Sequence, residues 1–142
     1  GRQIAAAFAL GAQGVWTGTI WLGTRESELT PMEKEVLFKA KSEDAVQRKW
    51  MTGKTGRMIR SKASEAWEQP GAPRHLKPPL QNILYHGARI RIEKAHRDDL
   101  CSFPAGQVVG NMKEETSVRQ VMQDLMQEYI DTAERISPLI NL

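Results

Sequence analysis

The segment of residues 14–19, Gly-Val-Trp-Thr-Gly-Thr, carries groups that can hold a phosphate. Glycine at position 18 lets the backbone approach an anion closely, because it has no Cβ atom. The amides of Gly18 and Thr19 can then donate hydrogen bonds to phosphate oxygens, and the Thr19 hydroxyl adds a third donor. Taken alone, a Gly-Thr turn after an apolar segment is also typical of an ordinary tight turn, so both interpretations stay open.

A few other side chains have chemistry to offer. Tyr85 and His86 are neighbours in a predicted helix and carry groups that can bind a carboxylate or nitro oxygen, while Arg57 can pair with an anionic substrate. Each of them also fits a packing or solvent-exposed role. His75 and His96 have no carboxylate or cysteine at a metal-ligand spacing, so we predict no metal site.

Composition narrows the classes of partner. Twenty Lys and Arg oppose seventeen Asp and Glu, and the resulting formal charge of +3 is spread without a basic block, which argues against nucleic acid. The single cysteine, Cys101, cannot form an internal disulfide, which favours a reducing, cytoplasmic compartment. No run approaches the roughly 20 apolar residues of a membrane span, so we expect no membrane segment.

Helical periodicity dominates the chain. Thr30 and Glu33 have the spacing of a capping box, with Pro31 at the first helical position. The last helix keeps one apolar face over about five turns, and we expect that face to pack on the first helix and on a strand rather than stay exposed. Helices are predicted at residues 4–10, with Gly11 as the stop, and at residues 31–41, 61–68, 80–96 and 118–136, with Pro138 ending the last one.

Strand signals are few. Residues 14–19 predict one short buried strand, fed by the Ala-rich first helix. Such a strand needs a parallel sheet around it, because its backbone donors and acceptors must be paired on both sides. Residues 42–51 weakly favour extended structure, and residues 52–57 predict a turn-rich loop. We therefore expect the neighbouring strands to come from elsewhere in a longer protein, with the chain beginning inside an element.

Four stretches of the chain resemble the nitronate monooxygenase (2-nitropropane dioxygenase) family. Residues 1–19 resemble its final helix–strand passage GR-IAAALALGA-GV--GT, and residues 52–57 resemble its TGKPAR stretch. Residues 66–73 resemble its AWE-PGAP segment, and residues 103–110 resemble its PAGQ-VG return strand. The stretches occur in the family's order and together span most of the chain, which favours a phosphate site over a plain turn.

The resemblance implies an α/β fold class, namely the C-terminal fragment of an FMN-binding TIM (β/α)8 barrel with a mostly helical inserted segment. Residues 1–23 would be the last helix–strand unit of the barrel with its phosphate loop. Residues 24–103 would form the helical substrate or lid segment, and residues 104–142 the return to the barrel and the final helix. These are expectations about organisation that follow from the family.

The same resemblance implies FMN as a cofactor held without a covalent link. A Gly-Gly-Ile type loop and the catalytic His of the family would both lie upstream of Gly1. The residues expected to bind the cofactor are Trp16, Thr17, Gly18 and Thr19 at the phosphate, and Gln107 near the flavin.

The implied reaction of the full-length enzyme is the oxidation of a nitronate or nitroalkane by oxygen to a carbonyl compound and nitrite. Tyr85 and His86 are candidates for the substrate pocket, and the segment alone should be inactive. An FMN-dependent enoyl reductase of the same barrel superfamily is an alternative, although the AWE-PGAP and TGK stretches favour the nitronate branch. A helical interaction domain without catalysis would instead use the apolar face of residues 118–136 to bind a partner, but the ordered matches count against it.

Overall fold

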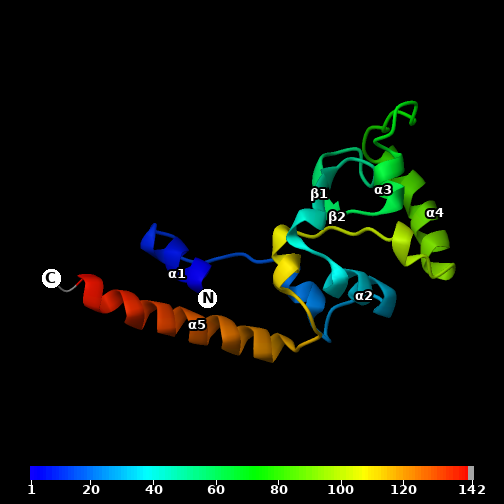
Figure 1. The fold of residues 1–142 in the computed structure, drawn as a ribbon. Helices are drawn as coiled ribbons and strands as arrows, with labels where there is room; N and C mark the ends of the chain where they lie inside the picture. The colour runs from blue at the N-terminus through cyan, green and yellow to red at the C-terminus, as the bar shows by residue number, and fades with distance from the viewer. Residues whose placement is uncertain (141–142) are drawn as a thin grey trace.

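A computed structural model describes residues 1–140 of the chain (Figure 1). Among the described residues, no helix is long and apolar enough to cross a membrane. The elements, in chain order, are α1 (Arg2–Ala9), the 3₁₀ helix η1 (Thr19–Gly23), α2 (Pro31–Lys39), η2 (Ser42–Asp44), β1 (Ala45–Arg48), β2 (Gly56–Ile59), α3 (Lys62–Ala66), α4 (Leu80–Lys94), η3 (Asp98–Leu100), η4 (Gln107–Asn111) and α5 (Val118–Ile140).

These elements form two regions, which we call the body (residues 19–111) and the arm (α1 with α5). Figure 1 shows the arm extending to one side of the body, with α1 lying along α5. The rings of Phe8 and Tyr129 meet edge to face in the arm, with centroids 5.7 Å apart. The chain therefore leaves α1, crosses to the body and returns to the arm only at its last helix.

The core of the body has two parts, separated by β2. This strand pairs antiparallel with β1, so that Ala45 faces Ile59 and Val46 faces Met58. Successive side chains of a strand point to opposite faces, and Ile59 and Met58 accordingly join different clusters. Around Ile59 pack Leu37, Ala40, Ala45, Cys101, Phe103, Ala105 and Val109; around Met58 pack Trp50, Met51 and Tyr85.

The start of α2 confirms the capping box. The Glu33 amide donates to Thr30 Oγ1 at 3.3 Å, and the Thr30 amide donates to Glu33 Oε2 at 2.9 Å. The Glu33 carboxylate is 2% exposed and also receives Arg89 from α4 at 3.2 Å, which keeps a buried charge paired. At the end of α1, Gly11 takes φ +96°, the left-handed conformation of a helix stop, as predicted. The helices at α2, α3 and α4 are confirmed within a few residues.

The predicted strand at residues 14–19 is wrong for this structure. Residues 14–18 belong to no strand, and η1 begins at Thr19. A lone strand leaves its backbone donors and acceptors without partners. No described strand or bridge pairs with residues 14–18. The turn-rich loop of residues 52–57 is wrong in its last two residues, because Gly56 and Arg57 open β2 against β1.

Two further corrections concern the C-terminal part. Residues 103–105 run along β2, but residues 107–110 of the expected return strand belong to η4. The helix α5 continues through Pro138 to Ile140 instead of ending at the proline. A proline in the last turn removes only one amide donor, and an exposed helix end can leave the freed carbonyl to water.

The apolar face of α5 is only partly covered, contrary to expectation. Val121 is buried, and Leu125 and Tyr129 are half-buried. Met122, Met126 and Ile130 remain exposed on the same helix. The first helix covers part of this face, and the predicted strand that should cover the rest does not form.

Candidate phosphate-binding site

Three segments distant in sequence meet beside η1. Residues 103–105 run next to β2, where the Ile59 amide donates to the Phe103 carbonyl at 3.1 Å and the Ala105 amide donates to the Arg57 carbonyl at 3.3 Å. One residue later, the Gly106 amide donates to Thr19 Oγ1 at 2.8 Å. Backbone hydrogen bonds thus join the strand to the return segment, and the Thr19 hydroxyl joins the return segment to the Gly18-Thr19 turn.

The meeting point forms a shallow hollow of about 450 Å³ that is open to solvent. Gly18, Thr19 and Leu22 line it from one side, and Arg57 and residues 104–106 line it from the other. The hollow therefore brings the turn of the predicted phosphate site together with part of the Ala-Gly-Gln segment, which the sequence places 87 residues away.

Two backbone amides at this turn have no hydrogen-bond acceptor among the described residues. The Gly18 carbonyl accepts from the Trp21 amide at 3.1 Å to open η1, but the Gly18 and Thr19 amides donate to no other described residue. First-turn amides of a helix lack partners within the helix. A Cβ atom added to Gly18 would meet nothing within 4 Å, so the space beside these amides is open.

Thr19 was predicted to donate its hydroxyl to a phosphate, and in the structure the same hydroxyl also accepts a hydrogen bond. Its Oγ1 accepts the Gly106 amide, which fixes the side chain while leaving the hydroxyl hydrogen to donate. The turn can therefore offer two amides and one hydroxyl to an anion. This donor set fits a phosphate group, although no side chain of the turn itself is charged.

Arg57 is the residue whose place the sequence interpretation missed. The sequence left open whether it pairs with an anionic substrate or is simply exposed to solvent, and the structure places it at the same hollow as Gly18 and Thr19. Its Nη1 donates to the Ala45 carbonyl at 2.7 Å. No signal in the sequence joins residues 18 and 57, since the link is made only through residues 103–106.

The other predicted cofactor residues, Trp16, Thr17 and Gln107, do not line this hollow. Trp16 is fully exposed, and the Thr17 carbonyl accepts from Trp21 Nε1 at 3.2 Å. Gln107 opens η4 and lines a neighbouring groove of about 980 Å³ between the body and the arm. Its backbone carbonyl accepts from Ser42 Oγ at 2.9 Å, and its side chain is exposed.

Tyr85 and His86 lie apart from the hollow. Tyr85 is buried against Trp50, edge to face at 4.8 Å, and its hydroxyl donates to the Ser102 carbonyl at 3.0 Å. Burial raises the pKa of this phenol to about 12. His86 is exposed on the next position of α4. Their part in a substrate pocket stays a prediction, and the Tyr85 hydroxyl already has a structural partner.

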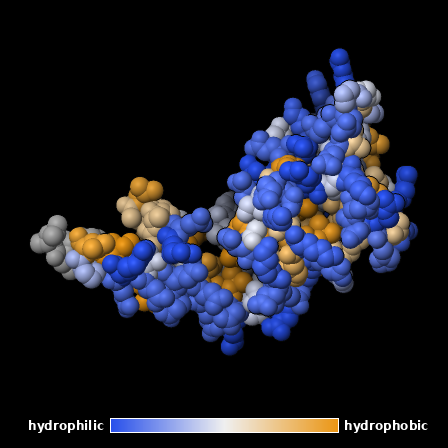
Figure 2. All heavy atoms as spheres, in the orientation of Figure 1, coloured by the Kyte–Doolittle hydropathy of each residue, from blue (hydrophilic) through white to orange (hydrophobic). Residues whose placement is uncertain are grey.

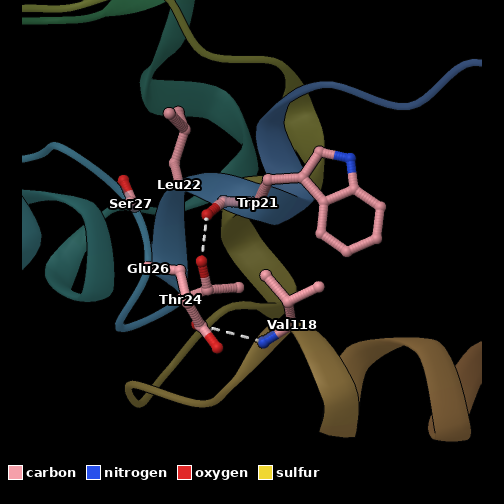
Figure 3. A pocket seen from close by; sticks show the side chains of 6 residues that line it. All are labelled: Trp21, Leu22, Thr24, Glu26, Ser27 and Val118. Atoms are coloured by element: carbon pink, nitrogen blue, oxygen red, sulfur yellow. Dashed lines mark hydrogen bonds between the residues drawn. The ribbon is translucent and has the colours of Figure 1, made fainter.

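A second hollow, of about 300 Å³, lies between η1 and the start of α5 (Figure 3). Its polar groups are in use: Thr24 Oγ1 donates to the Trp21 carbonyl at 2.8 Å, and Glu26 Oε2 accepts from the Val118 amide at 3.1 Å. Hydrogen bonds from the backbone amides of Glu26 itself and of Val118 lower the pKa of that carboxyl. This hollow is therefore a joint between η1 and α5, in which the polar groups hold the structure together.

Comparison with known proteins shows which proteins the chain resembles. The chain is 40% identical over 146 aligned residues to "Putative monooxygenase Rv1533" of Mycobacterium tuberculosis, covering 99% of the chain and 39% of that relative. It is 35% identical over 129 residues to "Probable nitronate monooxygenase" of Bacillus subtilis, covering 91% of the chain and 37% of the relative. The chain thus spans about two-fifths of the length of these relatives.

Solved structures resemble it over the same extent. FabK from Thermotoga maritima matches with a TM-score of 0.75 and 29% identity, over 99% of this chain and 44% of FabK. Nitroalkane oxidase from Streptomyces ansochromogenes matches with a TM-score of 0.79 and 26% identity, over 95% of this chain and 38% of the oxidase. The family model described as "Nitronate monooxygenase" matches residues 1–128. This match covers most of the mixed helix-and-strand chain, which therefore belongs to the nitronate monooxygenase family.

Proposed function

We propose that the chain is the C-terminal part of an FMN-dependent (β/α)8-barrel enzyme that oxidises alkyl nitronates with oxygen to a carbonyl compound and nitrite. The observation that carries the proposal is the hollow beside η1, where the Gly18 and Thr19 amides have no other described partner. In this proposal the hollow holds the FMN phosphate. Family membership and the fold similarity to nitroalkane oxidase support the same reaction class.

The organisation follows from the barrel. Residues 1–23 would be the last helix–strand unit with the phosphate turn, residues 24–103 the segment that covers the substrate, and residues 104–142 the return and final helix. Within the barrel, residues 14–18 would gain the strand neighbours that they lack among the described residues. The exposed position of Trp16 and the half-covered face of α5 are what such a unit leaves open.

The chain's own groups would bind and orient the cofactor. When bound, FMN supplies the redox chemistry. The Gly18 and Thr19 amides and the Thr19 hydroxyl would donate to its phosphate, and the Gly106 amide would keep the Thr19 side chain in place. Trp16, Thr17 and Gln107 would stand close to the cofactor around the same turn, and the catalytic His would come from an upstream barrel loop.

An FMN-dependent enoyl reductase is the second candidate, favoured by the fold similarity to FabK across 99% of the chain. The two activities separate in one assay on the full-length protein. Oxygen uptake that depends on a nitronate and needs no nicotinamide supports the oxidation proposal. Nicotinamide-dependent reduction of an enoyl thioester, without nitronate-driven oxygen uptake, supports the second candidate.

Substitutions at the turn test the phosphate assignment. In the full-length protein, Gly18→Val should weaken FMN binding severely, because a branched side chain would stand beside the two amides. The fold should survive, since a Cβ at Gly18 meets nothing within 4 Å. Thr19→Ala removes one hydroxyl donor and the acceptor of the Gly106 amide, so we expect roughly a tenfold loss of FMN affinity. Titration of the apo-protein with FMN measures both.

Gly14→Val is the matched control, because Gly14 is also exposed with open space at its Cβ but does not line the hollow. It should retain FMN at wild-type affinity, and circular dichroism should show all three variants folded. If Gly18→Val binds FMN with wild-type affinity, residues 18–19 form a structural turn without a role in phosphate binding, and the phosphate assignment is wrong.

A further inference from the structure

Arg57 differs from the ion-paired arginines of the body in the partners of its side chain. Arg48, Arg89 and Arg97 each have a carboxylate within ion-pair distance. Arg57 has none among the described residues, and its one hydrogen bond there runs from Nη1 to the Ala45 carbonyl at 2.7 Å. One arm of the guanidinium is therefore fixed by the backbone of β1, while its remaining N–H groups and its positive charge meet no partner among residues 1–140.

The same residue borders the candidate phosphate site. Of the described residues that line the hollow with Gly18 and Thr19, Arg57 alone is charged. The backbone amides of the turn offer only partial charges, whereas a phosphate monoester carries about −1.5 to −2 charges at pH 7. An arginine fork is suited to phosphate oxygens because it combines full charge with several parallel donors.

We infer that Arg57 recognises the phosphate of the bound flavin, supplying the full positive charge that the Gly18-Thr19 turn lacks. This inference rests on the proposed function, since it takes the FMN phosphate as the anion in the hollow. The Ala45 carbonyl holds one side of the guanidinium, and the free donors on the other side meet the phosphate. Arg57 thereby makes the site select FMN over riboflavin, which has the same ring system and side chain without the phosphate.

The experiment measures the dissociation constants of FMN and riboflavin for the apo form of the full-length protein, by quenching of flavin fluorescence. In Arg57→Gln, FMN affinity should fall by roughly 10- to 100-fold, because a charge-assisted hydrogen bond is lost. Riboflavin affinity should stay unchanged. Arg57→Lys should lose less FMN affinity than Arg57→Gln, because it keeps the charge and loses the fork.

Arg60→Gln is the matched control. Arg60 is also an exposed arginine whose side chain donates to a backbone carbonyl, that of Glu43 at 3.0 Å, but it does not line the hollow. Both flavins should bind this variant as they bind the wild type. If Arg57→Gln does not fold, Arg57→Lys carries the test, with a loss of FMN affinity and none of riboflavin affinity expected.

Two results would overturn the inference: unchanged FMN affinity in the Arg57 variants, or an equal loss for FMN and riboflavin, which would place Arg57 away from the phosphate. These results are distinct from failure of the proposed function. The proposed function is contradicted if the wild-type protein binds no FMN, or if Gly18→Val leaves the FMN affinity unchanged. FMN binding that depends on Gly18 but not on Arg57 contradicts the role of Arg57 alone.

Discussion

The body and the arm both contain helices, but they bury the apolar side chains of these helices to very different extents. In the body, Leu37 and Val109 are 0% exposed and Ile59 is 2% exposed. In the arm, α1 has no buried residue, and Met126 of α5 is 52% exposed. Figure 2 shows hydrophobic side chains at the surface of the arm, while much of the surface of the body in this view is hydrophilic.

The difference follows from how many neighbours each helix has. In the body, α2 is covered by β2, residues 101–105 and η4, so its apolar side is enclosed. In the arm, α1 and α5 have mainly each other, and two helices cannot cover both apolar faces. The arm is thus the region that gains most from the further barrel elements in the proposed full-length enzyme.

The same substitution, Leu→Asp, tests this difference in burial in both regions. We expect the larger loss of unfolding free energy in the body. Leu37→Asp would bury an unpaired carboxylate in the cluster around Ile59, which should cost more than about 4 kcal/mol of unfolding free energy. Urea denaturation of the chain of residues 1–142 and of the full-length protein measures it. A loss below about 1 kcal/mol would mean that the core of the body is not closed as described.

Leu125→Asp is the arm's counterpart and should cost less in the chain of residues 1–142. Leu125 is half-buried on α5, so its charged replacement can reach water, and we expect a loss of about 1 to 2 kcal/mol. In the full-length protein the loss should grow to several kcal/mol if barrel elements cover this face. Equal losses in the two proteins would show that nothing further covers Leu125.

Met126→Ser should give the smallest effect. Its side chain is more exposed than that of Leu125, so in the chain of residues 1–142 the unfolding free energy should change by no more than about 0.5 kcal/mol. Thermal unfolding followed by circular dichroism measures the change. A loss above about 2 kcal/mol would place Met126 in a packed interface and would remove the contrast between body and arm.

Local patterns of the sequence predicted the helices well. Thr30 and Glu33 are three residues apart, and their reciprocal hydrogen bonds form within one turn, so the capping box could be predicted without knowing the fold. The stop at Gly11 is equally local. The strand expected at residues 14–19 does not form, because a strand depends on distant partners and residues 14–18 have no strand partner among the described residues.

In the candidate site, too, local features could be predicted from the sequence and long-range contacts could not. The Gly-Thr turn at residues 18–19 was predictable from residue type alone, since a close backbone approach needs glycine and the donors are adjacent. The hollow was not predictable, because Gly106 reaches Thr19 from 87 residues away and Arg57 arrives through β2. Sequence by itself determined which groups can donate to a phosphate. Only the tertiary structure decided that the Arg57 guanidinium lies at the same hollow, because contacts of such separation depend on how β2 and residues 103–105 pack.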